Sequence, residues 1–232
     1  YFMHHSNLVT NYVMGNLGVR YDEMELVGGI IDQGFGIVKR TNDNRWTTVQ
    51  ELVEYVKKHP GEVTCGFPGF ASPGHFAFLQ FAEAAGISGM IKEVPYSGGA
   101  EAIRAHLGGE TDLRATNMGD SARYVASGDI EFICMVSQDP NPDYPTIPTL
   151  KVFGSDMEGL QLHTGLFAPK GTPKEIMEKF MSIMEDACAT QELKEFAKSM
   201  CNTIVVRDSE EFKAVYDTDL KNITEIAKIL RK

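Results

Sequence analysis

The chain has 232 residues, of which 43% are hydrophobic and 23% are charged, a composition typical of a soluble globular protein. Its formal net charge of −10 argues against nucleic acid or an anionic membrane as the main partner, because both need a basic surface. No apolar run approaches the roughly 20 residues of a membrane-spanning helix, and no signal peptide is visible. Since the chain begins with Tyr1 rather than Met, we expect it to be truncated at its N-terminus.

Strand-like and helix-like segments alternate along the chain, which is typical of an α/β protein with mainly parallel strands. The expected strands cover residues 1–5, 25–31, 35–40, 62–66, 91–96, 111–116, 131–137, 160–169 and 203–206. The expected helices cover residues 7–18, 48–60, 74–85, 100–109, 121–128, 171–188 and 209 to the C-terminus. Between Asp139 and Thr149 the four prolines indicate a rigid surface connection.

Two of these helices carry N-terminal capping signals. Thr48 and Glu51 have the spacing of a capping box, and Pro60-Gly61 ends that helix. Thr172 is the expected N-cap of the helix over 171–188, with Pro173 in its first turn.

The Gly/Pro-rich stretch GFPGFASPGH, between an expected strand and an expected helix, can be tested against two catalytic or phosphate-binding motifs. Gly69 and Gly74 have the spacing of a phosphate-binding P-loop, but His75-Phe76 stands where Lys-Ser/Thr is required. The stretch also resembles a nucleophile elbow, although Phe70 replaces its first glycine. A serine hydrolase that uses Ser72 with His75 or His163 stays as an alternative.

Histidine and cysteine spacing indicates no metal chemistry. The six histidines form no HExxH motif and no zinc-type pair with cysteine, so neither a metal nor another cofactor is expected. Cys65 and Cys134 lie in apolar runs and are expected to be buried. Cys188 and Cys201 flank a short helical segment and could pair in an oxidising compartment.

Three Gly/Ser-rich junctions, GFPGFASPG, PYSGGAEA and ATNMGDSA, each lead into an expected helix. The first amides of a helix lack internal partners and carry partial positive charge, so such an end attracts a carboxylate or a phosphate. Plain helix capping is the competing interpretation of each junction. Their recurrence after successive strands favours a ligand site, because open α/β sheets bind ligands beyond the carboxyl ends of their strands.

The same stretches carry a family resemblance. VPYSGGAEAIRAHLGGETDL, PDYPTIPTLKVFG and GLFAPKGTP resemble, in order, motifs of the tripartite tricarboxylate transporter solute-binding proteins, the TctC/Bug family. HPGEVTCGFPGFASPGHF resembles a further motif of that family. The resemblance runs along nearly the whole chain, while Lys151, His163 and Thr116-Asn117 depart from the family pattern.

The resemblance implies a type II periplasmic-binding-protein fold, with two α/β lobes and a ligand cleft between them. Lobe one would comprise residues 1–61 and 163–232, without its opening βα unit, and lobe two residues 62–162. Arg114 is a possible counter-ion, or it faces away from the ligand. The expected ligand-binding residues, through amides, hydroxyls or polar side chains, are Ser6, Asn7, Gly69, Phe70, Ala71, Ser72, Tyr96, Asn117 and His163.

The implied function is the capture of a small carboxylate outside the cytoplasm and its delivery to the membrane permease subunits of a transporter. The protein would be periplasmic or otherwise extracytoplasmic, with or without a lipid anchor, monomeric and not an enzyme. Another anion, such as sulfate, or an amino acid remains an alternative ligand, since a fold alone does not name its ligand.

Overall fold

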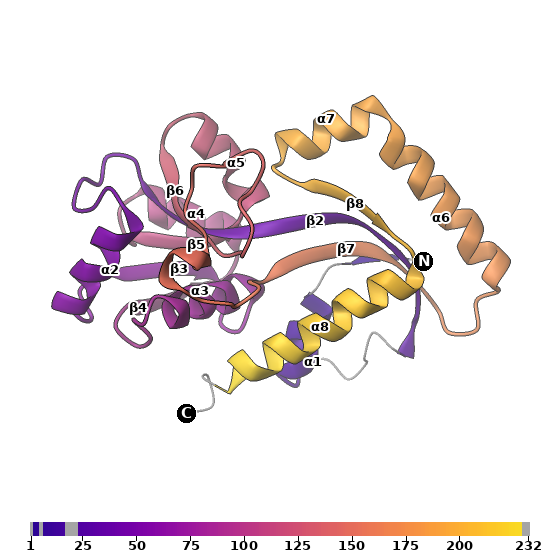
Figure 1. The fold of residues 1–232 in the computed structure, drawn as a ribbon, viewed down its shortest axis with the longest axis horizontal. Coiled ribbons are helices and arrows are strands. Elements are labelled where there is room, and N and C mark those ends of the chain that lie inside the picture. The colour runs from indigo at the N-terminus through magenta and orange to yellow at the C-terminus, as the bar shows by residue number, and fades with distance from the viewer. Residues whose placement is uncertain (1, 5–6, 17–22, 229–232) are drawn as a thin grey trace. The chain divides into compact units, whose positions relative to one another are not determined.

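A computed structural model describes residues 2–4, 7–16 and 23–228, and it contains the expected mixture of strands and helices (Figure 1). The chain forms two compact units. Unit 1 comprises Tyr1–Gln33 and Gln161–Lys232, and unit 2 comprises Gly34–Leu160.

The first change of unit lies in the middle of a strand, earlier than the boundary at 61/62 that we expected. β2 is one continuous strand over Glu25–Arg40, not the two strands predicted at 25–31 and 35–40. Its second half pairs with β5, from Phe35 to Lys39, and this pairing ties the chain after Gly34 to unit 2. The return to unit 1 falls at Leu160/Gln161, close to the expected 162/163.

Unit 2 is built on a mixed sheet in the order β6-β2-β5-β3-β4. β3 pairs in parallel with β4 and with β5, whereas β2 is antiparallel to β5 and β6. β4 contains Pro95, which fits its position at the edge of the sheet. The bounds of the strands are Thr64–Pro68 for β3, Lys92–Tyr96 for β4, Leu113–Asn117 for β5 and Ile130–Met135 for β6.

The helices of unit 2 are α2 (Val49–Lys58), α3 (Pro73–Ala84), α4 (Gly99–Leu107) and α5 (Met118–Ala126), with a 3-10 helix, η2, at Leu150–Phe153. The predicted capping box of Thr48 and Glu51 is confirmed at the start of α2. α3 and α4 both pack against β3 and β5.

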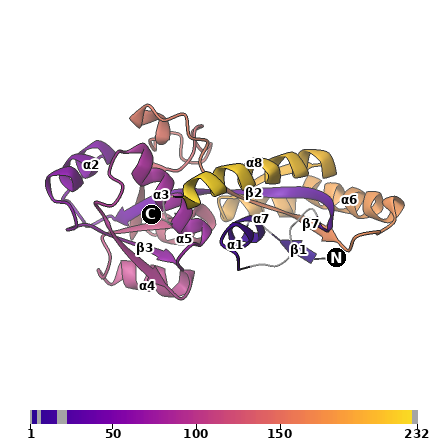
Figure 2. The same ribbon diagram turned by 90° about the horizontal axis from the view of Figure 1, so that it is seen from below.

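Unit 1 contains a second set of strands, in which β1 (Phe2–His4) pairs antiparallel with β7 (Gln161–Ala168). β7 neighbours the first half of β2, which also pairs antiparallel with β8 (Thr203–Arg207). α1 lies beside α8 in both views (Figures 1 and 2). The helices of unit 1 are α1 (Asn7–Val13), α6 (Lys174–Ala189), α7 (Gln191–Ser199) and α8 (Ser209–Ala227).

α6 begins later than the sequence suggested. Thr172 does not cap it, because the Thr172 hydroxyl donates to the carbonyl of Pro169 at 2.7 Å and the helix starts at Lys174 without a side-chain cap. The expected N-cap was therefore wrong.

Strand β7 is covered by helices on both of its faces, as the alternation of its side chains shows. Leu166 and Ala168 pack with the methionines of α6. On the alternate positions, Gly165 and Phe167 meet the ring of Phe212 from α8. This two-sided packing forms the core of unit 1.

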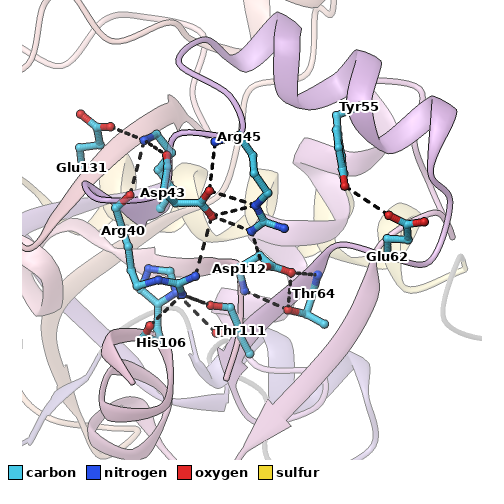
Figure 3. A network of polar contacts seen from close by, with 11 residues as sticks. Arg40, Asp43, Arg45, Tyr55, Glu62, Thr64, His106, Thr111, Asp112 and Glu131 are labelled. Atoms are coloured by element: carbon cyan, nitrogen blue, oxygen red, sulfur yellow. Dashed lines mark hydrogen bonds and ion pairs between the residues drawn. The ribbon is translucent and has the colours of Figure 1, made fainter. Parts of the chain in front are cut away.

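A polar network joins the amino ends of β3 and β5 in unit 2 (Figure 3). Arg45 donates to Asp43 and also pairs with Asp112. Asp112 in turn accepts from the amide of Thr64 at 2.8 Å and from its hydroxyl at 2.9 Å. These side chains satisfy one another at the edge opposite the carboxyl ends of the strands, so we assign them a structural role.

His106 lies next to this network and predicts a pH dependence of stability. The side chain is fully buried, and burial, followed by the charges of Arg40 and Arg114, lowers its pKa from an ordinary value near 6.5 to about 4. As the pH falls, His106 therefore becomes protonated at a higher pH in the unfolded chain than in the folded chain. Stability from this residue is complete above pH 6.5, and we expect about 3 kcal/mol to be lost as the pH falls to 4.

Urea unfolding followed by the fluorescence of Trp46, the single tryptophan, measures this loss in unit 2. His106→Gln should reduce the slope of stability against pH over that window. Gln50→Ala, at an exposed position of α2, alters no titratable group and should keep the slope of the natural protein. Equal slopes in all three proteins would contradict the assignment.

Candidate anion-binding site in unit 2

Three helices of unit 2 begin at one edge of its sheet. β3, β4 and β5 are parallel, and each is followed directly by a helix, α3, α4 and α5 respectively. Their N-termini therefore gather beyond the carboxyl ends of the strands, where open α/β sheets bind ligands. Close approaches join the loops: a Cβ on Gly69 would lie 4.0 Å from the carbonyl oxygen of Tyr96, and one on Gly99 would lie 3.2 Å from a carboxylate oxygen of Asp120.

The loop before α3 owes its shape to two consecutive tight turns. Gly69 and Ala71 both have left-handed backbone conformations, with φ of 91° and 57°. For Ala71 this conformation is strained by about 1 kcal/mol, and it directs the Ala71 amide to Nδ1 of His75 at 3.0 Å. The amide of Gly69 donates to the carbonyl of Phe67 in β3, and the amide of Ser72 donates to the carbonyl of Gly69.

Most amides of this loop are therefore already satisfied. We expected Ala71 and Ser72 to offer amides to a ligand, whereas in this structure the Ala71 amide donates to His75 and the Ser72 amide to Gly69. Within the described part of the chain, the amides of Phe70 and Gly74 have no hydrogen-bond partner. Phe70 is also 61% exposed, so the open donors lie at the tip of the loop and in the first turn of α3.

Ser72 caps α3 and does not pair with a catalytic histidine. Its hydroxyl oxygen accepts from the amide of His75 at 3.2 Å. The imidazole of His75 accepts from Ala71 at Nδ1 and lies 2.7 Å from Glu93 at Nε2, so both ring nitrogens have other partners. The nucleophile–base hydrogen bond that a serine hydrolase needs is absent between these two described residues.

The loop before α4 leaves several amides open. Ser97 is fixed by Glu101, whose carboxylate accepts from both its amide and its hydroxyl. The amides of Gly98, Gly99 and Ala100 have no partner among the described residues. The ring of Tyr96 packs over Gly66 of β3: a Cβ on Gly66 would lie 3.1 Å from it.

Burial, with the nearby charges of Glu110 and Glu101, raises the pKa of Tyr96 above its ordinary value. The structure thus brings the Tyr96 backbone to the edge of the sheet, while its ring lies over β3.

At the start of α5, Asn117 acts as the N-cap by accepting from the amide of Asp120 at 2.9 Å. Its side-chain amide also donates to the carboxylate of Asp120 at 2.9 Å. Arg114 is fully buried, donates to Thr116 at 2.6 Å and to Ser121 at 3.0 Å, and reaches within 3.9 Å of Asp120. Sequence reasoning missed Asp120, although its position three residues after Asn117 is a recognisable capping signal.

His163 belongs to a buried cluster in unit 1. Its Nδ1 lies 2.7 Å from Asp32, whose carboxylate also accepts two hydrogen bonds from Arg207 at 2.8 and 2.6 Å. Burial acts to raise the pKa of Asp32, but the hydrogen bonds from His163 and Arg207 hold it below its ordinary value. These contacts explain His163 without a ligand. Ser6 and the side chain of Asn7 lie outside the described residues.

All four cysteines are buried, and no disulfide joins Cys188 to Cys201, the pairing that the sequence left open. Burial raises the pKa of Cys134 to about 12 and also raises that of Cys65. Within the described ranges, no three histidine, cysteine or acidic side chains gather as a metal site would require. No helix among the described residues combines the length and apolar character needed to span a membrane.

Comparisons with known proteins agree with this architecture. The curated "UPF0065 protein in gbd 5'region" of Cupriavidus necator is 28% identical over 165 residues, which are 71% of this chain and 49% of that protein. The chain spans about half the length of such curated relatives.

Solved structures share the fold at low sequence identity. MatC from Rhodopseudomonas palustris, with bound malate, aligns with a TM-score of 0.82 at 18% identity over 97% of this chain and 77% of its own. R. palustris Rpa4515 with adipate aligns with a TM-score of 0.77 at 20% identity, over 89% of this chain and 68% of its own. The periplasmic binding protein BugD aligns with a TM-score of 0.80 at 22% identity, over 99% of this chain and 76% of its own. The α/β fold of periplasmic solute-binding proteins is thereby confirmed.

The family match covers nearly the whole sequence. Residues 2–230 match the family model described as "Tripartite tricarboxylate transporter family receptor", TctC, as the motifs around Gly98, Pro148 and Gly171 indicated. With segments of both units included in that match, this chain belongs to the TctC family of solute-binding receptors.

Proposed function

We propose that this protein captures a small organic carboxylate outside the cytoplasm and delivers it to the membrane subunits of a tripartite tricarboxylate-type transporter. The observation that carries the proposal is the set of open amides at the N-termini of α3 and α4, beyond the carboxyl ends of the parallel strands β3, β4 and β5. Such amides bind carboxylates without a lysine or arginine in contact. The related folds that hold malate and adipate support this ligand class.

In this proposal the carboxylate lies at the start of α3. The amides of Phe70 and Gly74 would donate to it, and the Ser72 hydroxyl, which is free to donate while its oxygen accepts from His75, would add a third hydrogen bond. Gly69 lets the ligand approach this backbone closely. Tyr96, Asn117 and His163 would then act as supports of the loops and of the core and not as ligand contacts.

Isothermal titration calorimetry with malate, adipate, citrate, sulfate and an amino acid tests the ligand class. We expect saturable binding of at least one carboxylate. Binding of sulfate or of the amino acid alone would favour the alternative ligands, and no binding to any of them would refute the proposal.

Ser72→Ala tests the contact at α3. We expect about a tenfold loss of carboxylate affinity, because a hydrogen bond to a charged group is removed. The same change also removes a helix cap, which costs about 1 kcal/mol of stability. Thr48→Ala removes the equivalent cap of α2 and is the matched control. Equal affinities in the two variants would show that Ser72 does not contact the ligand.

A further inference from the structure

A carboxylate of the chain itself lies beside the start of α4. Asp120 is half-exposed, and its Oδ2 lies 3.2 Å from where a Cβ on Gly99, the first residue of α4, would be. The amides of Gly98, Gly99 and Ala100 are open among the described residues, and the helix dipole makes this end attractive to negative charge. Asp120 therefore stands where an external anion would bind.

Two neighbours hold Asp120 in this position. The side-chain amide of Asn117 donates to Oδ2 at 2.9 Å, while the Asn117 oxygen accepts from the Asp120 amide. Nη2 of Arg114 lies 3.9 Å from the same Oδ2. Both contacts hold the carboxylate beside the start of α4.

Arg114 is a buried cation with incomplete partners. Its side chain is 1% exposed, and Nε has no hydrogen-bond partner among the described residues. Nη1 donates to the neutral hydroxyls of Thr116 and Ser121. Nη2 lies 3.8 Å from the Cβ position on Gly99, so the guanidinium points at the start of α4. A buried charge requires a counter-charge, and Asp120 supplies it from a half-exposed position.

We propose that Asp120 is an internal carboxylate that competes with a second ligand carboxylate for the position formed by Arg114, Asn117 and the first amides of α4. This inference rests on the proposed function, in which one ligand carboxylate binds at α3. Asp120 then determines the charge class of the ligand: it disfavours a second negative charge that the rest of this position would attract. A dicarboxylate enters only by displacing the Asp120 side chain.

Asp120→Asn tests the competition, because it keeps the size of the side chain and removes its charge. Adipate and hexanoate are suitable probes, since both have six carbons and they differ in one carboxylate. We expect the variant to bind adipate about tenfold more tightly than the natural protein does, because a like charge at close range is gone. Hexanoate affinity should change less than about twofold. Glu54→Gln, on the exposed surface of α2, makes the same change in net charge and should alter neither affinity.

The outcomes separate this inference from the proposed function. Binding by the natural protein with unchanged or weaker adipate binding in Asp120→Asn would refute the competition alone. No binding of either probe by any of the proteins would refute both proposals. Adipate binding that appears only in Asp120→Asn would support the competition.

Arg114→Met, added to Asp120→Asn, tests whether the buried guanidinium contributes to binding of the second carboxylate. The fold should tolerate it, because Ser121 still donates to Thr116 at 3.2 Å and Thr116 to the carbonyl of Asn117 at 2.9 Å. We expect the double variant to lose the tenfold gain in adipate affinity. A retained gain would show that the amides of α4 act without Arg114, and this part of the proposal would be wrong.

Discussion

Replacing Asp32 with Asn is expected to lower the free energy of unfolding by about 4 kcal/mol. Asp32 binds both His163 and Arg207 inside unit 1, with its side chain 10% exposed. The variant keeps the shape of the residue but turns an amide donor toward a guanidinium and leaves that charge partly buried without its partner. Urea unfolding followed by far-UV circular dichroism measures the change.

The matched control is Glu178→Gln, which breaks the exposed i,i+4 pair with Lys174 on α6. Such surface pairs contribute at most about 0.5 kcal/mol. If Asp32→Asn were no more destabilising than this control, the cluster around Asp32 would not stabilise unit 1.

Phe212→Ala is expected to destabilise unit 1 by about 4 kcal/mol, through lost burial and the cavity left behind. The ring is fully buried, lies over Gly29 and Gly165, and contacts Phe167 and Tyr216. Because Gly29 and Gly165 have no side chains, the ring of Phe212 packs directly on their backbone. Neither glycine can fill the cavity that Phe212→Ala would leave. Circular dichroism during urea unfolding is again the measurement.

Phe196→Ala, on the surface of α7, removes the same side chain where it is 58% exposed. We expect a change below about 1 kcal/mol there. Similar losses in the two variants would contradict the assignment of Phe212 to the core.

Local signals in the sequence predicted much of the fold. The capping box of Thr48, the helix expected over residues 74–85 and the alternation of strands and helices each depend on residues close in sequence. The structure has all of them, with α3 over Pro73–Ala84. The break expected within residues 25–40 was wrong, because strands far along the chain pair with this segment and determine its conformation. β8 pairs with the first half of β2, and β5 and β6 with the second, and together they keep one strand continuous.

The site was less predictable because its contacts depend on conformation. Ala71 gives no sign in the sequence that it adopts a left-handed conformation and donates to His75. His163 and Asp32 are 131 residues apart, so their pairing is not visible in any local pattern. Asp120 had a local signal, the capping spacing to Asn117, but its approach to Gly99 comes from the packing of α4 beside α5 in unit 2.

The central claim is that a carboxylate binds at the start of α3 in unit 2, and an amide-resolved NMR titration with malate tests it most directly. We predict saturable shifts of the Phe70 and Gly74 amides, the open donors of this loop among the described residues. The amides of Arg45 and Thr64, at the opposite edge of the sheet, should not move. Saturable shifts confined to that opposite edge, or no shifts at Phe70 and Gly74, would contradict the claim.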